Sequence, residues 1–235
     1  MLINTERFVL RDFILADRTP FVGYQMDPQY LRLYDLDETH RSKADELFAT
    51  FLRWQQETPR KNFQLGIFDR SSRLCGSIGL RRRSSDNEAV FGIELSPADW
   101  GRYGLALEVA SAMIDFGFGE LGLDRVVGDT ASGNRRITRF AQFFGAQIVD
   151  SREGPQWMKA RDWIEVDWAL TRSRWLSARA GLCRRESARS TFRQIGLSGA
   201  PEVERLSIEN QRQSRPVRST ASTRKKPSQV KRGLR

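Results

Sequence analysis

The segment Gly101–Ala106 places small residues at the point where an apolar strand gives way to a helix. Val90–Leu95 is rich in β-branched and aromatic residues and is stopped by Ser96-Pro97, which predicts a buried strand. From Gly104 onward apolar residues recur at helical spacing on two stripes, so a long helix covered on two sides is expected. Glycines leave backbone N–H groups uncovered, and N–H groups that converge at the positive end of a helix bind anions, usually phosphate.

A G-x-x-G-x-A loop alone is a weak signal, because about half of such stretches are simple turns in which glycine supplies a positive φ. Here the loop follows a strand, and a second predicted helix downstream begins at Asn134 and closes at Phe144-Gly145-Ala146. The order of these elements strengthens the prediction of a phosphate site.

The run Trp100–Glu108 (WGRYGLALE), followed by Asn134, Arg139 and Gly145, resembles the GCN5-related N-acetyltransferase (GNAT) superfamily, in particular its ribosomal-protein N-terminal acetyltransferase-like branch. Thr5–Arg11 resembles the opening strand of that branch, and the resemblance covers roughly the first 170 residues. It implies an α+β (mixed α/β) fold, with a central, mostly antiparallel sheet flanked by helices. It also implies acetyl-CoA as co-substrate and no metal.

The resemblance further implies which residues contact acetyl-CoA. In the family, the strand before the loop bulges and splays so that its backbone groups meet the pantetheine arm, which here means Ile93–Leu95. The residues expected to bind acetyl-CoA are Ile93, Leu95, Gly101, Arg102, Tyr103, Gly104, Leu105, Ala106, Asn134 and Arg139. Two simpler roles stand beside this expectation: Asn134 as the N-cap of its helix, and Arg102 and Arg139 as solvated arginines.

The sequence also departs from the family pattern. Gly101 stands where Gln or Arg is usual, one residue is inserted between Trp100 and Gly104, and Ala146 replaces a common Phe. The tyrosine that many members use as general acid falls on Ala141. The resemblance therefore supports CoA binding but leaves the general acid unassigned.

Glu94 is the candidate general base, because it alternates with apolar Ile93 and Leu95 and is expected to be partly desolvated. An equally weighted alternative is that Glu94 is an ion-paired strand residue or lies off the acceptor path. Glu88 is the second choice and fits better as a charge at a strand end. His40, the only histidine, is expected to be a surface side chain.

Acidic residues gather between the first two predicted helices, in the segment that walls the acceptor side in the GNAT family. Asp35, Asp37 and Glu38 would attract a cationic amine, although most charge runs are only solvated.

The remaining elements are predicted from periodicity and turn residues. Strands are expected at Phe8–Phe13, Asn62–Phe68, Leu74–Arg81, Glu88–Leu95 and Asp124–Asp129, with a closing hairpin of Ala146–Asp150 and Trp157–Leu170. Helices are expected from Asp17 to Met26, from Ala44 to Trp54, from Gly104, and over Asn134–Phe144, with an acidic loop over Leu31–His40.

Charge divides the chain into two parts. Residues 1–170 hold 22 Lys and Arg against 25 Asp and Glu, whereas residues 171–235 hold 17 against 4 and few large apolar residues. We expect residues 1–170 to form the acetyltransferase domain and residues 171–235 to form a basic, disordered tail, with weak RNA or ribosome contact as its alternative role. Two distant cysteines and no apolar segment of membrane-spanning length favour a cytoplasmic protein.

These observations predict an N-acetyltransferase that transfers an acetyl group from acetyl-CoA to a primary amine. The preferred acceptor is a protein N-terminal amine. A small cationic amine, such as a polyamine or an antibiotic, is the alternative acceptor, and a non-catalytic protein that binds CoA or nucleic acid is the alternative of another class.

Overall fold

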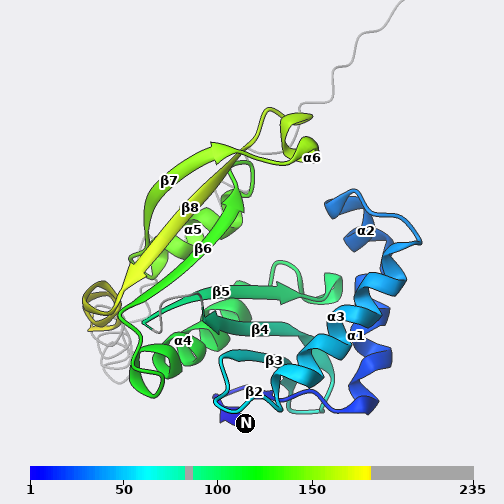
Figure 1. Ribbon diagram of the computed structural model, residues 1–235, viewed down its shortest axis with the longest axis horizontal. Helices are drawn as coiled ribbons and strands as arrows, with labels where there is room; N and C mark the ends of the chain where they lie inside the picture. The colour runs from blue at the N-terminus through cyan, green and yellow to red at the C-terminus, as the bar shows by residue number, and fades with distance from the viewer. Residues whose placement is uncertain (83–86, 181–235) are drawn as a thin grey trace, which may run out of the picture. The chain divides into compact units, whose positions relative to one another are not determined.

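The computed structural model describes residues 1–82 and 87–180. Their strands form one sheet, shown in Figure 1, with the spatial order β1-β2-β3-β4-β5-β6-β8-β7. The bounds are β1 Leu2–Asn4, β2 Phe8–Arg11, β3 Asn62–Asp69, β4 Leu74–Arg82, β5 Glu88–Leu95, β6 Arg125–Ala131, β7 Gln147–Glu153 and β8 Ile164–Thr171. Neighbouring strands are antiparallel except β5 and β6, which are parallel.

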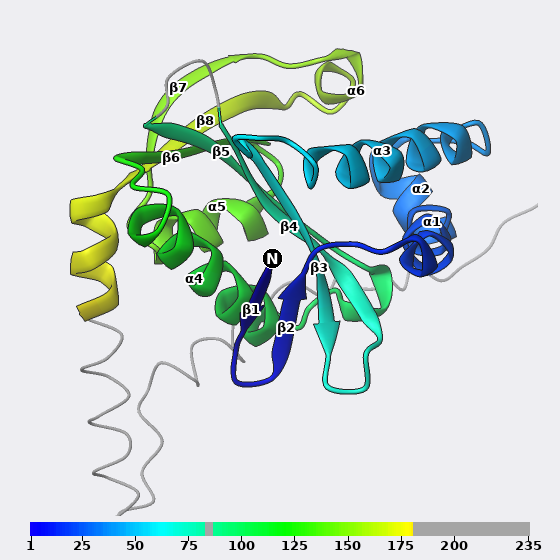
Figure 2. The same cartoon turned by 60° about the horizontal axis from the view of Figure 1, so that its bottom comes forward.

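Helices cover both faces of the sheet (Figure 2). One face carries α1 (Arg18–Gln25), α2 (Pro28–Tyr34) and α3 (His40–Trp54), and the other carries α4 (Tyr103–Gly119) and α5 (Arg135–Phe143). A short α6 (Gln156–Lys159) lies between β7 and β8, and 3₁₀ turns at Leu15–Asp17 and Pro97–Asp99 precede α1 and α4. Each face has its own cluster of buried apolar side chains. The predicted layers and the mostly antiparallel sheet are confirmed.

The predicted acidic loop over Leu31–His40 is wrong in part, because residues up to Tyr34 are helical. Pro28 does not merely follow α1 but occupies the first turn of α2, where its missing N–H costs nothing. The Asp27 side chain caps this helix by accepting a hydrogen bond of 2.7 Å from the Gln29 backbone N–H.

Two details at the ends of the sheet also differ from the predictions. Residues 2–4 form β1, which pairs with β2 from Leu2↔Arg11 to Asn4↔Val9, where no strand was expected. The long second strand of the closing hairpin begins only at Ile164, since α6 and a turn occupy the residues before it.

The folded unit extends beyond the expected boundary at residue 170. Residues 172–180 are helical, and Trp175 in this helix is only 1% exposed. Its ring centroid lies 5.4 Å from that of Phe144, and its indole N–H donates to Asp115 Oδ1 at 2.9 Å. Buried Trp175, together with a hydrogen bond of 2.9 Å from Arg172 to the Leu123 carbonyl, thus holds a segment that its composition assigned to a tail. The predicted tail from residue 181 onward lies outside the described residues.

No helix in the described ranges, 1–82 and 87–180, has both the length and the apolar character needed to cross a membrane.

Candidate active site

The neighbouring strands β5 and β6 pair only at their beginnings. β5 and β6 are in register from Glu88↔Arg125 to Val90↔Val127, and pairing stops there. Beyond this point the strands diverge, as Figure 1 shows. In residues 1–82 and 87–180, the second half of β5 therefore has β4 on one side and no paired strand on the other.

The open side of β5 presents backbone groups of alternate residues. The Ser96 N–H donates to the Cys75 carbonyl at 2.8 Å, so Ser96 and Cys75 form a hydrogen-bonded pair. Because hydrogen-bonded and non-hydrogen-bonded pairs alternate along antiparallel strands, Glu94 and Ser77 form the next hydrogen-bonded pair between β4 and β5. Ile93 and Leu95 fall in the other class of pair, so their N–H and C=O groups point away from β4 toward the open side. The Leu95 carbonyl accepts the Trp100 indole N–H at 2.9 Å.

The bulge expected at Ile93–Leu95 is absent from the β4–β5 pairing, which runs without a register shift from Arg82↔Ala89 to Gly76↔Leu95. The open edge arises because β6 diverges from β5 after Val127 while staying paired with β8, so β5 does not need to bulge.

The loop Gly101–Ala106 is solvent-exposed up to Gly104, where α4 has just begun. Gly101 has φ +87°, a conformation that favours glycine, and a Cβ added there would meet no atom within 4 Å. The N–H groups of the other loop residues bond within the loop or to Asp99, whereas those of Gly101 and Gly104 have no partner among the described residues. Two open amides thus stand at the start of a 17-residue helix, which is the geometry that favours an anion.

Arg102 has a structural role that the sequence did not show. Its Nη1 lies 2.6 Å from Oδ1 of Asp99, whose side chain is fully buried and also accepts two hydrogen bonds from Arg73 at 2.8 and 3.0 Å. Although burial raises the pKa of Asp99, the hydrogen bonds from both arginines outweigh it and hold that pKa below its usual value. Arg102 therefore anchors the turn before α4 and is not a free cation.

Helix α5 carries the two other predicted residues, Asn134 as its N-cap and Arg139 within the helix. The Asn134 side chain accepts the Ile137 N–H at 3.3 Å, so its N-cap role is confirmed. Arg139 is exposed, and its charge is felt by Tyr103, whose pKa is raised by burial and partly lowered by Arg139. The Tyr103 ring also lies against Phe140, with centroids 6.5 Å apart.

Glu94 points to the other face of the sheet, beneath α1 and α2. Its Oε1 accepts the Gln25 side-chain N–H at 3.0 Å and its Oε2 accepts the Tyr30 hydroxyl at 2.7 Å. The Tyr24 hydroxyl is buried beside this carboxylate, close to Ser77 on the neighbouring strand β4. The alternative that Glu94 belongs to an ion pair finds no support here, since its partners are neutral groups.

Three tyrosines near Glu94 keep their protons at neutral pH. Burial, followed by the charge of Glu94, raises the pKa of Tyr24 and Tyr30 well above the usual value and that of Tyr34 to about 12. These hydroxyls are therefore hydrogen-bond donors and poor acids. Ala141, at the position of the family's general acid, is 6% exposed and has no group that could replace it.

Comparison with known proteins agrees with this geometry. The family description "Acetyltransferase (GNAT) domain" matches residues 7–147. The chain belongs to this GNAT family. It is therefore an acyl-CoA-dependent N-acyltransferase.

The relatives of this GNAT chain include a Bacillus subtilis (strain 168) protein named Uncharacterized N-acetyltransferase YoaA, which is 28% identical over 149 residues, or 62% of this chain and 82% of that protein. A putative ribosomal-protein-serine acetyltransferase from Vibrio cholerae is 20% identical with a TM-score of 0.58, over 73% of this chain and 97% of that one. Spermidine N-acetyltransferase from Vibrio cholerae, solved with CoA and spermine, is 15% identical with a TM-score of 0.59, over 72% and 98%. Both solved structures share the fold of this chain.

The residues at the loop fit a CoA pyrophosphate. The space outside Gly104 is open, since an added Cβ would meet only the tip of Arg7 at 3.3 Å. Open amides at Gly101 and Gly104 supply donors, and the exposed cation of Arg139 lies on the neighbouring helix.

Two of the other acidic candidates, Glu88 and Asp37, have structural roles. Glu88 lies 3.5 Å from Arg125 at the far end of β5, as its simpler interpretation predicted. Asp37 accepts hydrogen bonds from the Thr39 N–H and hydroxyl and so stabilises the turn before α3. Asp35 ends α2 with φ 55°.

The sequence did not single out Gln25, Tyr24 and Tyr30, and it placed His40 at the surface. His40 is instead half-buried, with Nε2 at 3.0 Å from the Gln25 side-chain oxygen. One signal was present: Gln25 is a polar residue on the apolar stripe of α1, following Phe21 at i+4. A polar residue at a buried helical position usually has a partner.

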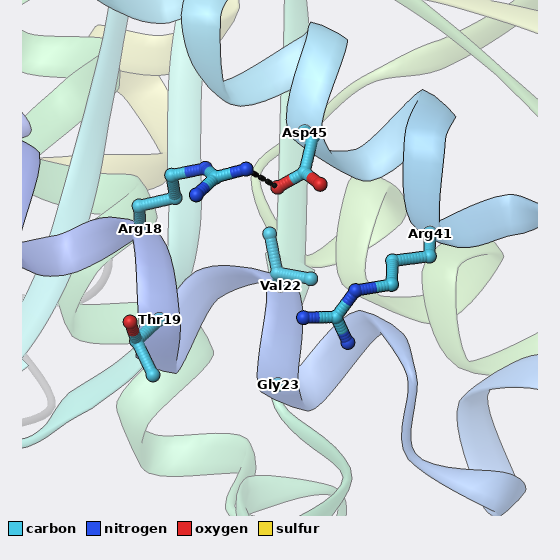
Figure 3. Close-up of a pocket in the computed structure, with 6 residues that line it drawn as sticks. All are labelled: Arg18, Thr19, Val22, Gly23, Arg41 and Asp45. Atoms are coloured by element: carbon cyan, nitrogen blue, oxygen red, sulfur yellow. Dashed lines mark ion pairs between the residues drawn. The ribbon is translucent and has the colours of Figure 1, made fainter.

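A small pocket of about 180 Å³ opens between α1 and α3 (Figure 3). Arg18 pairs with Asp45 at 2.9 Å on one side of it, and Arg41 faces it from α3. Its lining residues include neither Glu94 nor the groups that bind Glu94. The pocket is thus distinct from the catalytic candidate.

Proposed function

We propose that this GNAT protein transfers the acetyl group of acetyl-CoA to a primary amine and that Glu94 accepts the amine proton. The observation that carries the proposal is the position of Glu94. Its carboxylate is held by α1 and α2 at the half of β5 that β6 has left. A base at this position lies next to Ile93 and Leu95, whose backbone groups face the open edge.

Each group has one task in the proposed reaction. The thioester supplies an activated acetyl carbonyl, and the open amides of Gly101 and Gly104 hold the pyrophosphate. The backbone N–H of Ile93 polarises the carbonyl from the open side of β5. As the amine nitrogen forms its C–N bond and the C–S bond breaks, one proton leaves nitrogen for Glu94 or water, and the sulfur leaves as thiolate and is protonated from solvent.

The preferred acceptor is a protein N-terminal amine. Glu94 is surrounded by uncharged tyrosine and amide side chains, so the site beneath α1 and α2 offers one carboxylate to one amino group. A polyamine carries further ammonium groups that would need anions of their own. Asp35 and Glu38 lie in the connection just beyond α2, where they would favour acceptors with further positive charge, such as an N-terminus followed by basic residues.

Release of free CoA thiol tests the activity with acetyl-CoA and a panel of N-terminal peptides, polyamines and aminoglycosides. We expect peptides to give the highest kcat/KM. Faster turnover of spermidine would assign the acceptor to polyamines instead. A thermal shift with CoA but no thiol release with any acceptor would contradict catalysis while leaving CoA binding intact.

A further inference from the structure

Glu94 is the end of a chain of side-chain hydrogen bonds that reaches across two helices. Gln25 on α1 donates its Nε2–H to Glu94 Oε1 at 3.0 Å, and its Oε1 lies 3.0 Å from Nε2 of His40 on α3. Gln25 is 1% exposed, so its amide has no access to solvent as a substitute partner. Its orientation is therefore decided by these two neighbours.

The chemistry of the groups fixes the direction of every hydrogen bond in this chain. An ionised carboxylate only accepts, so the NH₂ group of Gln25 must face Glu94 and its oxygen must face His40. His40 must then donate from Nε2. A neutral imidazole has one N–H, which leaves Nδ1 as a lone pair, and Nδ1 is buried without a partner among the described residues.

These hydrogen bonds restrain the Glu94 side chain, which would otherwise rotate. Glu94 is half-buried on a strand with one open side, and its carboxylate ends a flexible side chain. Gln25 holds one oxygen and Tyr30 holds the other. The rings of Tyr30 and His40 stack at 6.0 Å with an interplanar angle of 24°, so α1, α2 and α3 each contribute one fixed group. Each carboxylate oxygen retains a further lone pair for the acceptor amine.

We infer that Gln25 and His40 are positioning residues for the base: the His40 N–H orients Gln25, and Gln25 orients the Glu94 carboxylate toward the acceptor. The inference rests on the proposed function, in which Glu94 receives the amine proton. Neither residue is assigned a proton transfer of its own. Their effect is on geometry, and small displacements of a reacting group cost rate far more than they cost stability.

The first test examines the direction of the hydrogen bonds without any reaction. The chain contains one histidine, so a long-range ¹H–¹⁵N spectrum of the untagged full-length protein reports on His40 alone. We expect the tautomer that is protonated at Nε2, and a change in its Nε2 signal in Gln25→Met. A histidine protonated at Nδ1, or one insensitive to Gln25→Met, would overturn the inference.

The second test separates positioning from packing. His40→Leu and Gln25→Met should lower kcat with saturating amine by about 10- to 100-fold and leave KM for acetyl-CoA unchanged. His40→Gln should recover most of the loss, because a glutamine Nε2 also donates. Equal rates of His40→Leu and His40→Gln would overturn the donor role.

The two proposals fail in different ways. If Glu94→Gln is inactive but Gln25→Met and His40→Leu turn over at the wild-type rate, the positioning role is wrong and the proposed base stands. If Glu94→Gln is as active as wild type, the proposed base is wrong. A thermal shift with CoA for each variant confirms that the fold and the cofactor loop are intact.

Discussion

Replacement of Trp175 by alanine should destabilise the whole domain. The side chain is 1% exposed, packs against Phe144 and donates a hydrogen bond to Asp115. A buried aromatic side chain covers about 150–250 Å², which at about 25 cal/mol per Å² corresponds to about 4–6 kcal/mol. Measured losses for Trp→Ala in cores are about 3–5 kcal/mol.

For a domain of this size, such a loss lowers Tm by about 6–20 °C. Thermal denaturation followed by circular dichroism measures the loss. Trp157→Ala, at a half-buried position in α6, is the matched control and should shift Tm far less. A loss below about 1 kcal/mol for Trp175→Ala would refute the reasoning, because it would mean that the 172–180 helix does not stabilise the core.

The same argument sets where the chain can be shortened. A chain ending at residue 180 keeps Trp175 and should retain the melting temperature and the turnover of the full-length protein, whereas one ending at residue 170 should lose at least as much stability as Trp175→Ala. Equal melting temperatures of the two shortened chains would contradict this prediction.

Three further substitutions, two of them paired with a control, test the site and the stability of the turn before it. Glu94→Gln should lower kcat/KM about 10²–10⁴-fold with CoA affinity unchanged, whereas Glu88→Gln, at the ion-paired end of the same strand, should change it little; a loss of similar size in both would argue against the base. Gly104→Val should abolish CoA binding measured by calorimetry without unfolding the protein, because the new side chain meets only the tip of Arg7. The control Gly119→Val, at the other end of α4 where an added Cβ meets no atom within 4 Å, should bind CoA normally. Asp99 has a lowered pKa, so its ion pairs stabilise the fold above about pH 4 and are lost as pH falls through its folded pKa. Asp99→Asn should therefore lower the free energy of unfolding by about 1.5–3 kcal/mol at pH 7, as measured by urea denaturation. A loss of stability that does not shrink toward pH 2 would contradict the ion-pair explanation.

The sequence predicted the features that depend on neighbouring residues. Glycine at Gly101 and Gly104, the strand before them and the apolar periodicity of α4 follow from short-range preferences, so the loop and its helix could be located without a structure. The N-cap at Asn134 is equally local. The order of these elements then carried the family resemblance.

Prediction was weakest where one residue changes what its segment does. Composition assigned residues 172–180 to a tail, but buried Trp175 packs this segment against the core, and Arg172 binds the Leu123 carbonyl. Arg102 was predicted to bind acetyl-CoA because it lies in the loop, and nothing in the sequence indicated that it also pairs with buried Asp99.

The sequence by itself therefore determined the fold family, through the order of its elements, and it located the candidate cofactor loop and Glu94 as a candidate base, because these two depend on residues close by in the chain. Only the tertiary structure decided what surrounds Glu94. Gln25 and Tyr30 are separated from it by 69 and 64 residues, and His40 reaches it only through Gln25. Such contacts depend on how α1, α2 and α3 pack against the sheet, and no local preference of the chain specifies that packing.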